Sequence, residues 1–450
     1  MRARLAPLSR EGRTDRASTT HAENVVDGHR VLPALVEDLS GARSSIHLSF
    51  FLFFNDPIGQ ALADVLCARA RAGVAVRMLI NKAKTEKGDP FSTGEREMME
   101  HDPGFHEDPM DVDPLIERLC DAGVRVHDTD LDFDRDPPTS DPSLVEQARL
   151  IRETSRMDIA HVDHRKIVVV DGRVAWIGSA NVGAQYLFRI PFDPGVDGKE
   201  EGDRAAREGR PEPWWKWHDG LVRLEGPVVA DVDAAFRERW VLDGGDDYGR
   251  VERVGGGPPR GIPVERADVF KNQPDSTPNA IRRLFLECIG SARESIFIEN
   301  PYLYHPAIVE ALVAARRANP SLRVDLIVPG MAWNDSEFSQ DAMQHHYPAL
   351  LEAGVAVHEY QHHFTHLKLA TFDERVAIVG SANLNYRSLE DDNDFELVAR
   401  LEGGEFARRV NAEVRDVDLR HSRRLTREGL TFRERVRDPR TLLLLSRRLL

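Results

Sequence analysis

The sequence HRKIVVVDGRVAWIGSAN, residues 164–181, decides the fold of this chain, because HLKLATFDERVAIVGSAN at residues 366–383 repeats it. In both copies a lysine follows the histidine by two residues, an aspartate by seven and a glycine by fourteen. A lone His-x-Lys pair on a strand is usually part of a solvated face. A pair that recurs at the same spacing, each time followed by Gly-Ser-Ala-Asn, indicates two copies of one functional unit.

Each copy predicts two strands joined by a tight turn. In the first copy, Arg165–Val170 is an apolar run typical of a buried strand, Asp171-Gly172 is a hairpin turn, and Val174–Ile177 is the returning strand. Because side chains alternate along a strand, the histidine and the lysine of each motif are expected on the same face.

The returning strand of each copy ends in Gly-Ser-Ala-Asn, which is expected to place Ser179, Asn181, Ser381 and Asn383 beside the two His-x-Lys pairs. We expect a helix to start at this point and to offer free backbone N–H groups. Two imidazoles, two ammonium groups and several neutral donors would then surround one spot.

The repetition extends beyond the motif. GARSSIHLSFF at 41–51 corresponds to SARESIFIENP at 291–301, and each follows an amphipathic helical pattern. A helix that begins with proline and a second strand come next in both halves, at 57–72 and 74–80, and at 306–317 and 322–328. Alternating strands and helices favour an α/β fold. We predict two similar lobes, each a mixed sheet flanked by helices on both faces, related by a pseudo-two-fold axis around one shared active site.

The predicted order along the chain is an N-terminal tail, a first lobe, a linker rich in glycine and proline, a second lobe and an amphipathic C-terminal segment, at residues 1–20, 21–242, 243–262, 263–440 and 441–450. Three insertions in the first lobe predict surface loops, at 85–110, 128–158 and 188–213. The C-terminal TLLLLSRRLL fits either a membrane-surface segment or a last helix packed on the body.

The charge of the chain bears on its partners and its location. Sixty basic and 75 acidic residues give a net charge of -15, which counts against sequence-independent binding of nucleic acid, since such binding needs many cations. No apolar run is long enough to cross a bilayer. Three widely spaced cysteines, Cys67, Cys120 and Cys288, predict buried thiols in a reducing compartment. We expect a cytoplasmic protein, soluble or peripherally associated with the inner face of the membrane, without a nucleic-acid partner.

Four carboxylates occupy matching positions in the two halves. Asp171 and Asp373 stand at the predicted turns, where aspartate bonds nearby backbone, so a structural role is favoured over a catalytic one. Asp219 and Glu396 open two segments that align without gaps, DGLVRLEG and ELVARLEG. Each could accept the ring N–H of a motif histidine and so fix its tautomer, or could be an exposed acid at the start of a strand. The sequence leaves both interpretations open.

The doubled motif suits cleavage of a phosphodiester, which needs a nucleophile, a proton for the leaving oxygen and positive charge around the phosphate. An imidazole is neutral or protonated near pH 7, so His164 and His366 suit the first two roles. Lys166 and Lys368 would stabilise the developing charge. Other histidines nearby fit no usual spacing of metal ligands, so a site without metal or cofactor is expected.

These residues resemble the phospholipase D superfamily, whose His-x-Lys-x4-Asp motif is present twice. The resemblance runs from about Asn24 to Leu401. It is closest to bacterial cardiolipin synthases and related phosphatidyltransferases, in the segments NVVDGHRVLPALVEDLSGARSSIHLSFFLF, HRKIVVVDGRVAWIGSANV, WHDGLVRLEGPVV and GSANLNYRSLE.

The resemblance implies a metal-independent reaction in two steps, through a covalent phosphohistidine. It assigns His164 as the nucleophile and His366 as the general acid and then the general base, with the reverse assignment open. The groups that it implies for holding the phosphate are Lys166, Lys368, Asn181 and Asn383, with Ser179 and Ser381 in support.

Three functions remain open at this point. The favoured one is a phosphatidyltransferase or phospholipase D that takes a phospholipid substrate and an alcohol or water acceptor, with transient contact to a membrane surface. The second is a phosphodiesterase or nuclease of the same superfamily that acts on a non-lipid substrate. The third is a catalytically silent interaction module. The headgroup, the acceptor and the oligomeric state do not follow from the sequence.

Overall fold

The structure is a computed structural model of the chain, and it describes residues 19–87, 111–129, 139, 141–142, 144–145, 162–189, 191, 193–196, 216–273, 279–390 and 394–430. The predicted C-terminal segment, nearly all of the predicted N-terminal tail and most of the three predicted insertions lie outside these residues.

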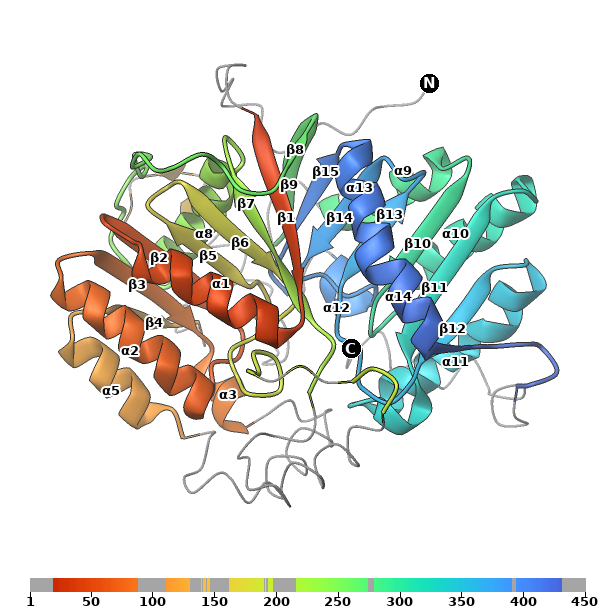
Figure 1. Cartoon of the computed structure of the whole chain (residues 1–450), viewed down its shortest axis with the longest axis horizontal. Helices are drawn as coiled ribbons and strands as arrows, with labels where there is room; N and C mark the ends of the chain where they lie inside the picture. Colours follow the sequence, from red (N-terminus) through yellow and green to blue (C-terminus); the bar gives the residue numbers. More distant parts are fainter. Residues whose placement is uncertain are drawn as a thin grey trace.

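Two eight-stranded sheets form the two lobes, which lie side by side in Figure 1. The first sheet has the order β4-β3-β2-β5-β6-β7-β1-β8 and the second β16-β12-β11-β10-β13-β14-β15-β9. The strands of the first sheet are β1 (Thr20–Val26), β2 (Ser45–Phe50), β3 (Ala75–Ile80), β4 (Arg125–Asp128), β5 (Ile167–Val170), β6 (Val174–Gly178), β7 (Gly220–Glu225) and β8 (Ile262–Val264). Those of the second sheet are β9 (Arg266–Asn272), β10 (Ser295–Glu299), β11 (Arg323–Pro329), β12 (Ala356–Tyr360), β13 (Leu369–Phe372), β14 (Val376–Gly380), β15 (Glu396–Glu402) and β16 (Ser422–Arg424).

The two sheets repeat one topology. Seven strands correspond in order, from β1 with β9 to β7 with β15, and only the added edge strands, β8 and β16, differ. In each sheet the three strands joined through helices pair in parallel, and the strands from the motif onward pair antiparallel. Parallel neighbours need a crossover helix, whereas a two-residue turn suffices for the hairpin at the motif. The predicted mixed sheets in two similar lobes are confirmed.

Helices cover both faces of each sheet. The outer helices of the first lobe are α1 (Gly28–Ser40), α2 (Pro57–Arg71) and α5 (Asp113–Asp121), and those of the second are α9 (Ala280–Ser291), α10 (Pro306–Ala318) and α11 (Glu337–Glu352). On the inner faces, α8 (Val229–Leu242) packs on β5 and β2, and α13 (Gly404–Val410) packs on β14 and β15. The shorter helices are α3 (Lys82–Lys87), η1 (Met331–Trp333), α12 (Tyr386–Leu389), η2 (Asn411–Arg415), α14 (Asp416–Asp418) and η3 (Leu419–His421).

Three apolar cores result from this layering. Two of them lie between a sheet and its outer helices, one in each lobe. The third contains residues of both sheets together with α8 and α13, for example Ile177 and Val379, which are both fully buried or nearly so. Because burial of apolar area is the main force that favours folding, this shared core joins the two lobes into one body.

The linker ends inside the first sheet. Strand β8 starts at Ile262 and pairs with β1, and β9 starts at Arg266 in the second sheet, so the chain crosses between sheets at Glu265. The predicted lobe boundaries stay a prediction.

The predicted helix at the Gly-Ser-Ala-Asn sequence is wrong for the first copy, where Val182 forms an isolated bridge with Phe53 and residues 183–187 form bends and turns. Two backbone bonds explain the difference. The Val182 N–H donates to the Leu52 carbonyl at 3.1 Å, and the Ala184 N–H donates to the Asp56 carboxylate at 2.6 Å. The same carboxylate caps the N-terminus of α2. The segment is therefore bonded to the start of that helix and does not form a helix itself.

Two further expectations are tested by burial and length. Cys67 and Cys288 are buried, but Cys120 is exposed, so the expectation of three buried thiols is wrong for Cys120. Among the helices of the described ranges, none has both the length and the apolar character that a membrane span needs.

Candidate active site

The two motifs lie where the lobes meet. His164 and His366 stand shortly before β5 and β13, and the backbone of each is bonded to the opposite lobe. The His164 N–H donates to the Phe395 carbonyl at 3.0 Å, and the His366 N–H donates to the His218 carbonyl at 2.8 Å. The matched pair of bonds places the two histidines symmetrically about the junction.

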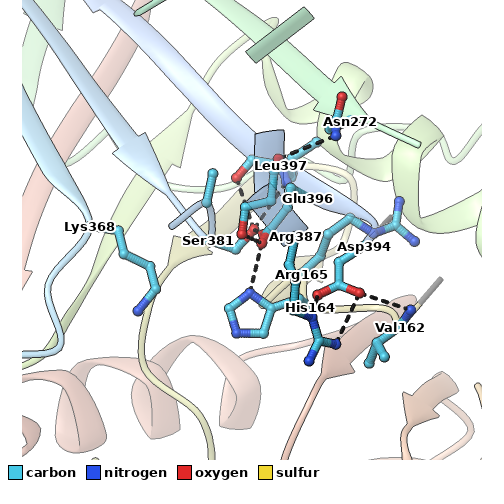
Figure 2. A network of polar contacts seen from close by, with 12 residues as sticks. Val162, His164, Arg165, Asn272, Lys368, Ser381, Arg387, Asp394, Glu396 and Leu397 are labelled. Carbon is cyan, nitrogen blue, oxygen red and sulfur yellow. Dashed lines mark hydrogen bonds and ion pairs between the residues drawn. The ribbon is translucent and has the colours of Figure 1, made fainter. Parts of the chain in front are cut away.

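Each motif histidine also bonds a carboxylate of the opposite lobe. Nδ1 of His164 lies 2.9 Å from Oε1 of Glu396, and Nδ1 of His366 lies 2.7 Å from Oδ2 of Asp219. A dashed line marks the first of these bonds in Figure 2. Both acids are fully buried rather than exposed. A carboxylate that accepts the Nδ1–H leaves the Nε2 lone pair of the ring free for chemistry. The acid of the first lobe therefore bonds the histidine of the second, and the acid of the second lobe bonds the histidine of the first.

Serine hydroxyls hold the two carboxylates in place. Ser179 donates to Asp219, and Ser381 donates to Glu396. Ser388 adds a second bond to Glu396, at 2.6 Å from Oε1. The resemblance implies that the first two serines support the phosphate, which stays a prediction, and in the structure both hydroxyls bond the acids.

The two motif lysines are almost completely buried close to the histidines. Nζ of Lys166 donates to the His164 carbonyl at 2.6 Å, and Nζ of Lys368 lies 3.0 Å from the His366 carbonyl and 2.9 Å from His366 Nε2. Burial lowers the pKa of Lys166 to about 7 and that of Lys368 to about 8, although Glu396 and Asp219 raise both values. An anion between the two ammonium groups would therefore raise both pKa values.

Burial and the lysines keep both histidines neutral. Burial, and then the charges of Lys166 and Lys368, lower the pKa of His164 well below its ordinary value of 6.5. Burial and Lys368 lower the pKa of His366 to about 3. Burial raises the pKa of Glu396. These pKa values favour neutral imidazoles, and the carboxylates at Nδ1 favour the tautomer that carries its proton there.

The two asparagines of the Gly-Ser-Ala-Asn sequences reach the same pocket. Asn181 Oδ1 accepts the Leu52 N–H at 3.2 Å, which leaves its NH₂ group as a donor. Asn383 Oδ1 is buried and has no hydrogen-bond partner among the described residues. Both side chains line one pocket together with His164 and His366.

Residues outside the motifs complete this pocket. Its aromatic wall consists of Phe51, Tyr186, Trp217, Tyr302 and Tyr304, and its polar wall includes Asp335, Ser336, Ser339, Asn385, Arg387, Ser388 and Asp394. Arg387 binds Asp394 through two bonds of 2.9 and 3.2 Å, and Asp394 accepts the Val162 N–H at 3.3 Å. Sequence reasoning missed Ser388 and this ion pair, because the first half has no equivalent that a repeat could reveal.

The turn aspartates lie away from the pocket. Asp171 accepts the backbone N–H groups of Arg43, Ser44 and Ser45 at 2.9, 2.7 and 3.0 Å. Asp373 makes the same three bonds to residues 293–295, at 2.9, 2.7 and 2.9 Å. Neither lines the pocket. Each aspartate ties the motif hairpin to the start of the neighbouring strand, which is a structural contact.

Asp171→Ala is expected to lower the free energy of unfolding by about 2–4 kcal/mol, because three N–H groups lose a charged acceptor. The residue also has a φ of 55°, where alanine is strained. Thermal or urea unfolding measures the loss. Activity per folded molecule should stay within about twofold of wild type, and a larger fall in kcat would contradict a purely structural role.

Two clusters of potential metal ligands occur among the described residues. One is buried and consists of His218, Glu299 and Asp418, and the other is largely exposed and consists of Glu86, Asp111 and Asp113. Neither includes a motif residue. Both ring nitrogens of His218 already bond carboxylates.

Comparison with known proteins agrees with this architecture. A family model described as "Cardiolipin synthase, PLD-like domain" matches residues 35–189 and 285–417, which is more than half of the chain. The probable cardiolipin synthase YwiE of Bacillus subtilis is 27% identical over 410 residues, covering 90% of this chain and 67% of that protein. Cardiolipin synthase A of Pseudomonas aeruginosa strain PAO1 is 27% identical over 432 residues, covering 94% and 72%.

A solved structure has the same fold. The phosphatidylserine synthase of Haemophilus influenzae Rd KW20 superposes with a TM-score of 0.59 at 14% identity, covering 94% of this chain and 92% of that one. The two matched lobes, the doubled motif and the family match over both halves lead to one conclusion. This chain belongs to the family of phospholipase D-like domains of the cardiolipin synthase type.

Proposed function

We propose that this protein is a phosphatidyltransferase of the phospholipase D type, which moves the phosphatidyl group of a phospholipid to an alcohol through a covalent phosphohistidine. Water is the competing acceptor. The observation that carries the proposal is the crossed pair of bonds, His164 to Glu396 and His366 to Asp219. They present two Nε2 atoms to one pocket whose nearby lysines would receive a phosphate. The names of the relatives support phospholipid substrates.

The first step transfers the phosphatidyl group to the protein. Nε2 of one histidine forms a bond to phosphorus, and the bond from phosphorus to the leaving alcohol breaks. The electron pair of that bond goes to the leaving oxygen, which takes a proton from Nε2 of the other histidine. Burial and the lysines lower the pKa of both rings, so one ring must take up a proton from solvent when the phosphate binds. The anionic phosphate makes that possible, because its charge opposes that of the lysines and raises the imidazole pKa.

The second step returns the group to an acceptor. The acceptor hydroxyl gives its proton to the histidine that acted as acid, a new bond between oxygen and phosphorus forms, and the phosphorus–nitrogen bond breaks. Lys166 and Lys368 stabilise the charge on the non-bridging oxygens in both steps. The residues of this chain supply every group in this scheme, so we propose a reaction that needs no metal.

His164 is the better nucleophile of the two. Its Nε2 has no hydrogen-bond partner among the described residues and its side chain is 12% exposed, whereas Nε2 of His366 lies 2.9 Å from the Lys368 ammonium and its side chain is 6% exposed. A nucleophile needs a free lone pair that reaches the phosphorus. His366 is then the acid of the first step and the base of the second.

The function is tested with purified protein and vesicles of phosphatidylglycerol, with and without an added alcohol. The expected products are cardiolipin and glycerol without the alcohol, and a phosphatidyl alcohol with it. If no lipid product and no released headgroup form from any common phospholipid, the proposal fails. The alternative function, a nuclease, is tested with single- and double-stranded DNA as substrates. We expect neither to be cut, since the net charge of the chain is -15.

The pH dependence of kcat/KM follows from the buried lysines. Their pKa values of about 7 and about 8 mean that the charged forms exist below these pH values and are lost above them. Because kcat/KM reports the free enzyme, it should begin to fall above about pH 7, where Lys166 loses its charge, and fall further above about pH 8, where Lys368 does. In contrast, kcat should fall less, since a bound phosphate raises both pKa values. A kcat/KM that stays flat up to the ordinary lysine value of 10.5 would contradict the buried-lysine account.

We also propose that the loop between β11 and α11 contacts the membrane surface. Met331, in η1, is 57% exposed, the highest value among the large hydrophobic side chains of the described residues. The same loop continues to Asp335 and Ser336, which line the pocket. An exposed apolar side chain on a loop that also lines the pocket would enter the interface that holds the substrate.

Met331→Glu is expected to raise KM for vesicles about five- to tenfold and to leave turnover of a monomeric short-chain phospholipid unchanged, because one buried apolar side chain contributes roughly 1–2 kcal/mol. Val145→Glu is the matched control, since Val145 is 37% exposed and does not line the pocket. Equal effects of Met331→Glu on both substrates would argue against membrane contact.

A further inference from the structure

A second cluster of charged side chains lies next to His366 and Asp219, outside the residues that line the pocket. His218 is its centre, with Nδ1 2.8 Å from Oδ1 of Asp27 and Nε2 3.1 Å from Oδ2 of Asp418. Asp27 follows β1 in the first lobe and Asp418 ends α14 in the second, so the cluster crosses the junction of the lobes. The imidazole bonds carboxylates on both sides, which requires two ring N–H donors and therefore a protonated ring.

The surroundings of His218 favour this charged form. Burial alone lowers its pKa, but the charges of Asp418 and Asp27 raise the pKa well above the ordinary value of 6.5. The ring also stacks on Tyr360, with centroids 5.2 Å apart. Glu299 is fully buried near Asp418, and burial together with Asp418 raises the pKa of its carboxyl group well above the ordinary value.

This cluster bonds the backbone of both partners in the His366–Asp219 pair. The His218 carbonyl accepts the His366 N–H at 2.8 Å, and the Asp27 N–H donates to the Asp219 carbonyl at 2.7 Å. His218 directly precedes Asp219 in the chain. A shift of the imidazole would therefore move the acid and the histidine that it orients.

One side chain of the cluster reaches the residue before His366. The Thr365 hydroxyl donates to Glu299 Oε1 at 2.5 Å, and both residues are fully buried. Thr365 and His218 also form one of the two isolated parallel bridges between the lobes among the described residues. The positions of His366 and Asp219 are thus fixed from both sides of the junction.

The other half of the site is supported differently. The position that corresponds to His218 holds Phe395, and the position of Thr365 holds Asp163. Asp163 is bound by Arg165 through two bonds of 2.8 Å, and that guanidinium lies 5.4 Å from the Phe395 ring. The His164 side therefore has an aspartate paired with an arginine, and the His366 side has an imidazolium between two carboxylates.

We propose that His218, held between Asp27 and Asp418, is a positioning residue for the His366–Asp219 pair and thereby for the acid–base half of the reaction. The inference rests on the proposed function, in which His366 protonates the leaving alcohol. The positioning role requires that the side chain at position 218 is a cation with hydrogen-bond donors on both sides. Arginine meets this requirement and glutamine does not.

The test measures the first step alone, as the burst of product in the purified full chain. Two substrates are compared, phosphatidylglycerol and a phosphatidyl ester of p-nitrophenol, whose leaving group departs without a proton. His218→Gln should slow the burst with phosphatidylglycerol about 10- to 100-fold, as loss of a supporting contact commonly does, with KM within about threefold. The p-nitrophenol ester should be slowed less than about threefold.

His218→Arg is the rescuing variant, and it should restore the phosphatidylglycerol burst to within about fivefold of wild type. Because an arginine side chain does not bind a metal ion, restored activity in His218→Arg would also argue against a metal at this cluster. His47→Gln controls for the loss of a buried histidine paired with a carboxylate, because His47 bonds Asp233 at 2.6 Å in the first lobe and does not line the pocket.

Two results would overturn the positioning role: equal slowing of both substrates by His218→Gln, or a His218→Arg variant as slow as His218→Gln. Failure of the proposed function looks different. In that case wild-type protein would give no burst with either substrate and no covalent adduct on a histidine.

Discussion

Replacing His164 by asparagine is expected to abolish the covalent intermediate and to lower kcat by about 10⁴- to 10⁶-fold, the range seen when a nucleophile is removed from an enzyme that forms a covalent intermediate. Phosphohistidine is the observable. Wild-type protein quenched during turnover of a ³²P-labelled phospholipid should carry label on the peptide that contains His164, and His164→Asn should carry none. Thermal unfolding should be nearly unchanged, because the asparagine amide can also donate to the Glu396 carboxylate that binds His164.

His366→Asn is the matched variant. It lacks the base for the second step, so with the p-nitrophenol ester it should accumulate label on His164 rather than lose it. Label on His366 in the His164→Asn variant would reverse the assignment of the two histidines. Absence of label from both positions in wild-type protein would remove the covalent mechanism.

Glu396→Gln is expected to lower kcat by about 10²- to 10⁴-fold, because a neutral amide cannot secure the Nδ1–H tautomer or stabilise an imidazolium. Glu396 binds Nδ1 of His164, so the formation of labelled phosphohistidine should slow with both good and poor leaving groups. Rapid-quench measurement of the label checks this. The matched control is Ser388→Ala, which removes one hydroxyl from the carboxylate and should cost only about three- to tenfold.

Because each acid bonds the histidine of the opposite lobe, the corresponding variant Asp219→Asn should behave differently from Glu396→Gln. Asp219→Asn acts on His366, so it should slow phosphatidylglycerol strongly and the p-nitrophenol ester weakly in the first step. If Glu396→Gln and Asp219→Asn gave the same substrate pattern, the two acids would not serve different histidines. A difference between them ties each acid to a separate step of the reaction.

Much of the fold follows from local sequence patterns. The buried runs at β5 and β13, the proline at the start of α2 and α10, and the repeat at 41–51 and 291–301 predict strands and helices that the structure contains. Periodicity and turn chemistry act over a few residues, so they can be read without the partner elements. The wrong prediction of a helix after Ser179 shows the limit, since Asp56, more than 100 residues away in the chain, captures the N–H of that segment.

The sequence alone determined which residues could do the chemistry, through two His-x-Lys motifs at equal spacing and two aligned acids. Only the tertiary structure decided how they combine. Glu396 lies 232 residues from His164, and Asp219 lies 147 residues from His366, so no local pattern could assign each acid to its histidine. The lowered pKa of both lysines and the cluster around His218 have the same origin. They depend on burial and on charges from both lobes, and these exist only after the shared core has brought the two sheets together.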